Sequence, residues 1–158
     1  MHDPSLSTAQ HRELIEALAL SHVLPHDTLP VEECLGRRLA VDIRSLIPLP
    51  PFTNSAMDGF AVRHEDLEGE GPWTLPVAGD IPAGDTRENR LERGQAWRIM
   101  TGAPIPAGAD TVVKVENTDH AAGIAQAPET VEIRVAPKLG ANVRVAGEAL
   151  EAGSPVLE

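Results

Sequence analysis

The chain opens with apolar residues at the spacing of one helix face. Three of them recur at helical intervals: Leu14, Ile15 and Leu18. Ser7 followed three positions later by Gln10 has the spacing of a capping box, in which two side chains satisfy free backbone amides at a helix N-terminus. The pattern predicts an amphipathic helix that begins after Ser7 and ends near residue 20.

Residues 26–45 contain short apolar runs separated by proline and glycine. A periodic piece at residues 31–35 is followed by alternating apolar and polar positions at residues 39–43. We interpret the segment as a strand, a short helix and a second strand. Three prolines come next: Pro48, Pro50 and Pro51. Because each fixes its own φ and disfavours helix in the residue before it, they predict a stiff connection and a domain boundary.

From residue 52 to residue 139 no helical period is sustained. Short strand-like runs alternate there with glycine and proline turns: residues 59–63, 73–78, 96–100, 111–116 and 130–135. Residues 142–157 alternate again. We therefore expect a mixed α+β chain, with an all-β unit at residues 48–141 and the terminal segments, 1–47 and 142–158, packed on one another.

Charge and composition exclude one large class of function. The formal net charge is −11, and the chain holds only two Trp, two Phe and no Tyr. A field of that sign repels phosphate backbones, and few rings are present on which bases could stack. We expect no nucleic-acid partner.

Two further features indicate a cytoplasmic protein. No apolar run approaches the roughly 18 residues that a membrane span needs, and the N-terminus lacks the pattern of a secretory signal, so no membrane partner is expected. The single cysteine, Cys34, cannot form an internal disulfide. Because it lies in an apolar stretch, we expect it to pack as a small hydrophobic residue in a reducing compartment.

Two polar clusters are candidates for chemistry. The first is Asn-Ser-Ala-Met-Asp-Gly at residues 54–59. Its composition is in the first place that of a turn. The rigid prolines before it would also pre-organise the Ser55 hydroxyl and the Asp58 carboxylate. The second, at residues 98–110, runs from a strand into Thr101, Gly102 and two alternating prolines. It is either a stiff turn or a loop whose backbone approaches a ligand at Gly102.

Other chemistries find no support in the residues. Pro25 separates His22 from His26, so the pair need not share a helix face on which to bind zinc. No glycine-rich nucleotide loop occurs, and Cys34 has no recognisable base partner.

Taken together, two stretches resemble the signature motifs of the molybdopterin molybdenumtransferases, the family of bacterial MoeA and the gephyrin E domain. They are Pro-Phe-Thr-Asn-Ser-Ala-Met-Asp-Gly-Phe-Ala-Val-Arg at residues 51–63 and Arg-Ile-Met-Thr-Gly-Ala-Pro-Ile-Pro at residues 98–106. Shorter matches follow the expected order at residues 76–79, 108–113 and 142–148. The resemblance covers nearly the whole chain.

The resemblance implies an architecture. Residues 1–47 and 142–158 would form an elongated linker domain into which a barrel-like β-domain, residues 48–141, is inserted. Members of the family continue into a molybdopterin-binding α/β domain and a C-terminal β-barrel, whose motifs do not occur in these 158 residues. We therefore expect the N-terminal part of such an enzyme, inactive alone.

The resemblance also implies an activity and partners. The family inserts molybdate into adenylylated molybdopterin during molybdenum cofactor biosynthesis, with Mg²⁺ bound mainly by the α/β domain. A homodimer is expected, in which the β-domain of one subunit forms the in-trans wall of the other subunit's cleft. The upstream partner would be a molybdopterin adenylyltransferase.

Site residues follow from the motifs. Asp58 is expected to be catalytic and a metal ligand, and Thr101 to be its catalytic hydrogen-bonding partner. Four residues are expected to bind substrate: Asn54, Ser55, Gly102 and Glu148. The chain departs from the family at Ala149, where an Asp is usual, so one carboxylate is missing.

A different class of function stays open. The chain could be a non-catalytic module for dimerisation or partner binding, with the two motifs kept as turn structure. A coding sequence that continues into the α/β motifs would favour the enzyme, and a stop codon after Glu158 would favour the module.

Overall fold

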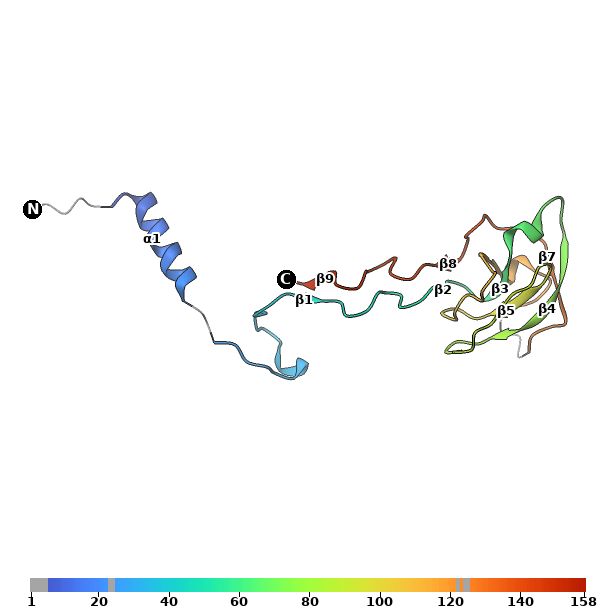
Figure 1. The fold of residues 1–158 in the computed structure, drawn as a ribbon, viewed down its shortest axis with the longest axis horizontal. Helices are drawn as coiled ribbons and strands as arrows, with labels where there is room; N and C mark the ends of the chain where they lie inside the picture. Colours follow the sequence, from blue (N-terminus) through green and yellow to red (C-terminus); the bar gives the residue numbers. More distant parts are fainter. Residues whose placement is uncertain (1–5, 23–24, 122, 124–125) are drawn as a thin grey trace, which may run out of the picture. The chain divides into compact units, whose positions relative to one another are not determined.

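A computed structural model describes residues 6–22, 25–121, 123 and 126–158 (Figure 1). The chain divides into two compact units: the first ends at Asp42 and also includes Glu158, and the second comprises Ile43–Leu157. In the described part of the chain, no helix is both long enough and apolar enough to cross a membrane. The expected division into residues 48–141 and residues 1–47 with 142–158 stays a prediction.

Helix α1 of the first unit spans Thr8–Ser21, where the apolar spacing predicts it. Ser7 and Gln10 form the predicted capping box: the Gln10 N–H donates to Ser7 Oγ at 3.3 Å, and the Ser7 N–H donates to Gln10 Oε1 at 2.8 Å. None of the helix residues is buried. The apolar face of α1 is therefore exposed.

Most of the strand structure expected in residues 26–45 is absent. A 3₁₀ turn, η1, spans Val31–Glu33 and accounts for the short helix, but no strand precedes it among the described residues. After it, only Ile43–Arg44 forms a strand, β1. An alternating pattern becomes a strand only where a partner supplies hydrogen bonds, and here the partner reaches just these two residues. The expectation that Cys34 packs as a buried residue is also wrong, because its side chain is exposed.

The second unit begins and ends in a two-stranded antiparallel ribbon (Figure 1). Its paired strands are β1 with β9 (Pro155–Leu157) and β2 (Asn54–Ser55) with β8 (Val143–Arg144). Between these pairs Leu49 bridges Leu150, and the Gly147 N–H donates to the Pro50 carbonyl at 3.0 Å. The proline run therefore lies within the ribbon and is held by the returning chain.

A five-stranded mixed sheet forms the rest of the second unit, in the order β6-β3-β5-β4-β7. Its strands are β3 (Gly59–Val62), β4 (Trp73–Ile81), β5 (Ala96–Ile99), β6 (Thr111–Lys114) and β7 (Thr130–Ile133). Strands β4 and β5 are parallel, and the other pairs are antiparallel. Among the described residues of this stretch the helical segments are two 3₁₀ turns, η2 (His64–Leu67) and η3 (Val115–Asn117).

The sheet curls toward closure. Thr118, which follows η3, bridges Ile133 of the opposite edge strand, and the Arg134 N–H donates to the Asn117 carbonyl at 2.8 Å. The result is a half-barrel, so the fold is the expected mixed α+β class, with the helix α1 and a barrel-like β unit.

Two apolar clusters hold the sheet. Along β3, Phe60 and Val62 enter one cluster and Ala61 enters the other, because successive side chains of a strand point to opposite faces. The first cluster also contains Leu67, Leu75, Ala96, Val113, Val115, Val131 and Ile133, and the second Ile81, Ile99, Ala103 and Val112. Both faces of β3 are therefore packed, which fixes the position of the residues at its ends.

Candidate active site

Asp58 and Thr101 meet at one end of the sheet. Asp58 directly precedes β3, and Thr101 follows β5 by two residues. The two strands are antiparallel with Gly59 opposite Ile99, so these ends coincide. Thr101 donates to Asp58 Oδ1 twice, from its backbone N–H and from its hydroxyl, each at 2.7 Å. The expectation that Thr101 is the hydrogen-bonding partner of Asp58 is confirmed.

The two oxygens of the Asp58 carboxylate differ. Oδ1 takes both bonds from Thr101, whereas Oδ2 accepts no hydrogen bond from any residue that the structure describes. Asp58 is partly exposed and lines a small pocket with Gly59, Phe60, Arg98 and Met100, among others. The carboxylate is therefore held through Oδ1, and Oδ2 is available to accept a bond from a ligand.

Its surroundings keep Asp58 ionised. The backbone and side-chain hydrogen bonds from Thr101 hold the pKa of the Asp58 carboxyl below its usual range, and the positive charge of Arg98 acts in the same direction against partial burial. A general base works best with a pKa near the working pH. Asp58 is thus better suited to act as a fixed negative charge or an oxygen ligand than to accept a proton in a reaction.

Asn54 and Ser55 shape the loop from inside. Both are buried. The Asn54 amide donates to the Phe52 carbonyl at 3.1 Å, and the Ser55 hydroxyl donates to the Met57 carbonyl at 2.6 Å. A substrate-binding role for Asn54 and Ser55 stays a prediction.

Gly102 has a conformational role. Its φ is +79°, in the left-handed region that favours glycine, and no atom lies within 4 Å of where a Cβ would be. Its N–H donates to the Ser55 carbonyl at 2.8 Å. Gly102 therefore turns the chain after Thr101, and its expected role in substrate binding stays a prediction.

Glu148 lies in the ribbon, apart from the Asp58 pocket. Its carboxylate accepts from the Arg144 Nε–H at 2.9 Å and from the Val145 N–H at 3.0 Å, and the bonds from Arg144 and Val145 lower its pKa. Among the described residues it makes no contact with Asp58 or Thr101. A substrate-binding role for Glu148 stays a prediction.

The metal prediction fits only in part. Within the described ranges, no three His, Cys, Asp or Glu side chains gather closely enough to hold a metal ion. Asp58 Oδ2 is one carboxylate oxygen, and Mg²⁺ is commonly held by one or two carboxylates together with phosphate oxygens and water. A Mg²⁺ ion beside Asp58 would need its other ligands from outside this chain.

The sequence did not single out the partner of Arg98. Arg98 is only 8% exposed, and its Nη1 donates to Asp80 Oδ2 at 3.3 Å. These two residues are opposite each other in the parallel pairing of β4 with β5. Spacing along the chain gives no signal for such a pair, because the strands are not joined as a hairpin.

Comparisons with known proteins agree with this architecture. Residues 6–158 match the model of the MoeA N-terminal region (domain I and II). A molybdopterin molybdenumtransferase 2 from Mycobacterium tuberculosis is 44% identical over 133 residues, which are 82% of this chain and 31% of that protein. A molybdopterin molybdenumtransferase from Nostoc sp. is 37% identical over 157 residues, 98% of this chain and 31% of that protein.

Solved structures show the same likeness. Two structures of the MoeA molybdopterin biosynthesis protein from Pyrococcus horikoshii are 30% identical to this chain, with TM-scores of 0.75 and 0.73. They match 93% and 84% of this chain, which covers 37% and 34% of theirs. The chain thus spans about a third of the length of its relatives. It belongs to the family of the MoeA N-terminal region, domains I and II.

Proposed function

We propose that this chain works as the N-terminal part of a molybdopterin molybdenumtransferase, which inserts molybdate into adenylylated molybdopterin. The observation that carries the proposal is the Asp58 carboxylate, fixed at Oδ1 by Thr101 and presented at Oδ2. Asp58 and Thr101 come from the two segments that resemble the family motifs, and relatives of 44% and 37% identity bear the transferase name.

Asp58 would act as a permanent negative charge in this reaction. Its lowered pKa keeps it ionised at neutral pH, and the two hydrogen bonds from Thr101 restrict its orientation. Mg²⁺ held by ligands outside the chain could take Oδ2 as one further ligand, and when bound it would neutralise phosphate charge on the substrate. The residues of this chain orient that oxygen.

The chain would supply one wall of a cleft, and the groups that bind the substrate phosphates would come from another region. With a net charge of −11 and no phosphate-cradling loop in its sequence, it offers little to attract an adenylylated substrate. We therefore propose that the cleft is completed in trans within a homodimer, by the molybdopterin-binding domain of the other subunit. A molybdopterin adenylyltransferase would deliver the substrate.

One observation favours a second function. Helix α1 buries none of its residues, and its apolar side chains Leu14, Ile15 and Leu18 are exposed. Such a face is typical of a segment that packs against another surface, as in a dimerisation or partner-binding module. The two functions differ in whether Asp58 is needed for chemistry.

The test replaces Asp58 in a full-length molybdopterin molybdenumtransferase that contains this chain. Asp58→Asn keeps the size of the side chain and removes its charge, so we expect molybdate insertion to fall at least about a hundredfold while thermal unfolding is nearly unchanged. The matched control is Asp110→Asn, since the Asp110 carboxylate also accepts a backbone N–H, from His64 at 2.8 Å, and does not line the Asp58 pocket.

The outcomes separate the two functions. A loss of insertion confined to Asp58→Asn supports the catalytic role. Equal insertion by both variants and the wild type would favour the binding module. If Asp58→Asn loses stability in proportion to activity, the motif is a structural turn and the catalytic proposal fails.

A further inference from the structure

We infer that Arg98, anchored by Asp80, is a positioning residue for Asp58. It acts through its positive charge across the pocket that both residues line, and through its contact with Met100, the residue before Thr101. The inference rests on the proposed function, and it adds a residue pair to which neither the sequence motifs nor the comparisons assign a role. Arg98 would act through Asp58 without touching the substrate.

Strand register places Arg98 behind the site. In the sheet Arg98 of β5 lies opposite Phe60 of β3 on one side and opposite Asp80 of β4 on the other. Asp58 directly precedes β3, two residues before Phe60. Arg98, Phe60 and Asp58 all line the same small pocket. The guanidinium is in position to act on the carboxylate from within the sheet.

Arg98 also reaches the loop that carries Thr101. Its Nη2 donates to the Met100 sulfur at 3.9 Å, and Met100 directly precedes Thr101. The guanidinium is therefore associated with both halves of the site, the carboxylate of Asp58 through charge and the Thr101 loop through Met100.

Asp80 fixes the guanidinium. One of its carboxylate oxygens accepts from Arg98 Nη1 at 3.3 Å, and the other is buried with no hydrogen-bond partner in the described structure. The side chain of Arg98 is 9% exposed and that of Asp80 36% exposed, and a buried charge is costly unless an opposite charge compensates it. Asp80 therefore compensates the buried charge of Arg98.

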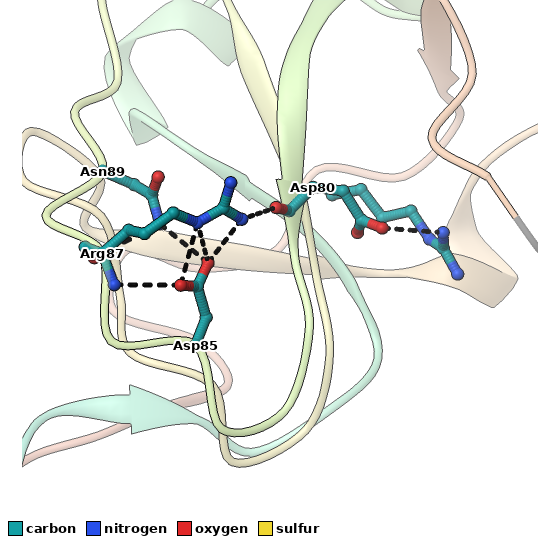
Figure 2. A network of polar contacts seen from close by, with 5 residues as sticks. Asp80, Asp85, Arg87 and Asn89 are labelled. Atoms are coloured by element: carbon teal, nitrogen blue, oxygen red, sulfur yellow. Dashed lines mark hydrogen bonds and ion pairs between the residues drawn. The ribbon is translucent and has the colours of Figure 1, made fainter.

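A loop network holds Asp80 in turn (Figure 2). Arg87 Nη2 donates to the Asp80 backbone carbonyl at 3.1 Å and to Asp85 Oδ2 at 2.7 Å. The Asp85 carboxylate also accepts from the Asn89 amide at 3.3 Å. Figure 2 shows these three side chains gathered on one side of Asp80. The end of β4 is thus braced on both sides, through its backbone by Arg87 and through its carboxylate by Arg98.

Arg98 is the cation best placed to act on Asp58. The charged residues on elements packed around Asp58 are Arg98 of β5, Asp80 of β4, Lys114 of β6 and Glu116 of η3. Of these, within the described residues, Arg98 alone lines the pocket with Asp58. The burial of its guanidinium weakens the screening of its positive charge by solvent.

The first experiment observes Asp58 directly in the 158-residue chain, by titrating its side-chain carboxyl carbon with NMR. We expect Arg98→Gln to raise the pKa of Asp58 toward its ordinary value, because the positive charge is lost. Arg98→Lys keeps a charge without the planar guanidinium, so its effect should be smaller and of the same sign. The control is Arg134→Gln, which removes an exposed arginine paired with Glu132 on β7 and should leave the Asp58 titration unchanged.

The second experiment measures insertion kinetics of the same variants in the full-length protein. Arg98→Gln should lower kcat at least about tenfold with KM nearly unchanged, since Arg98 acts through Asp58, and Arg98→Lys should recover part of the loss. Should Arg98→Gln fail to fold, Arg98→Lys alone decides: an Asp58 titration and a kcat both equal to wild type would overturn the inference.

The remaining outcomes distinguish this inference from the proposed function. If Asp58→Asn abolishes insertion but Arg98→Gln leaves kcat and the Asp58 titration unchanged, the positioning role is wrong and the proposed function stands. If Asp58→Asn has no effect on insertion, the proposed function fails and the positioning role fails with it.

Discussion

Two hydrogen bonds from one residue decide how the Asp58 carboxylate is presented. The Thr101 N–H and hydroxyl both reach Oδ1, so one oxygen is held and the other is left for a ligand. Hydrogen bonds to an ionised carboxylate are stronger than bonds between neutral groups. They therefore both orient Asp58 and stabilise its charged form.

Removing the hydroxyl alone separates these two bonds. Thr101→Val keeps the backbone N–H and the shape of the side chain, and we expect it to raise the pKa of Asp58 toward its ordinary value. Thr101→Ser retains the hydroxyl and should titrate like the wild type. The measurement is NMR titration of the Asp58 carboxyl carbon. An Asp58 pKa that is the same in the valine variant and the wild type would show that the hydroxyl does not stabilise the ionised form.

At the same scale, the sequence motifs located the site but not its contacts. Asp58 and Thr101 could be singled out because each lies in a proline-flanked polar cluster. Spacing along the chain gave no sign of the partner of Asp58, and only the family resemblance indicated Thr101. Thr101 is 43 residues away, and antiparallel pairing of β3 with β5 brings it to the carboxylate. Ser55 satisfies a nearby backbone carbonyl instead.

Among the elements, β3 depends on a glycine that the composition suggested was part of a turn. Gly59 lies in the strand, and a Cβ at that position would be 1.9 Å from the Val113 carbonyl oxygen of β6. The two strands can approach this closely only where no side chain intervenes. The glycine next to Asp58 thus serves the sheet on which the site is built.

Substitution of this glycine should therefore damage the whole sheet. We expect Gly59→Ala to lower the free energy of unfolding by more than about 3 kcal/mol, because a backbone carbonyl cannot move aside without breaking the ladder. Gly102→Ala is the comparison: it meets no atom within 4 Å but has a φ of +79°, so about 1 kcal/mol is expected. Chemical denaturation of both variants gives the two values. Equal losses would contradict the backbone clash.

Prediction of the elements succeeded where the signal is local. The capping box and apolar spacing located α1, and alternation between turns located the five sheet strands. It failed at residues 39–42, where alternation has no hydrogen-bonding partner to complete a strand. The parallel pairing of β4 with β5, and with it the contact of Asp80 with Arg98, depends on tertiary structure that no local pattern encodes.

At the scale of the whole molecule, the negative charge and the lack of a phosphate-binding loop in the sequence limit what the chain can do alone. A net charge of −11 opposes a substrate that carries phosphates. We expect the 158-residue chain to show no insertion of molybdate and only weak affinity for adenylylated molybdopterin. Calorimetric titration of the chain, with an insertion assay containing molybdate and magnesium, measures both. Micromolar binding or measurable turnover would place the complete site within these residues. It would contradict the proposal that this chain forms only one wall of the cleft.

The most direct test of a cleft formed in trans mixes two inactive full-length proteins. One carries Asp58→Asn with an intact molybdopterin-binding domain, and the other carries an intact Asp58 with that domain inactivated. If the cleft forms in trans, random pairing should restore about one quarter of the wild-type insertion rate, because half of the dimers are mixed and each has one intact cleft. No recovery, with mixed dimers demonstrated by differently tagged subunits, would contradict the claim that Asp58 and Thr101 serve the cleft of the other subunit.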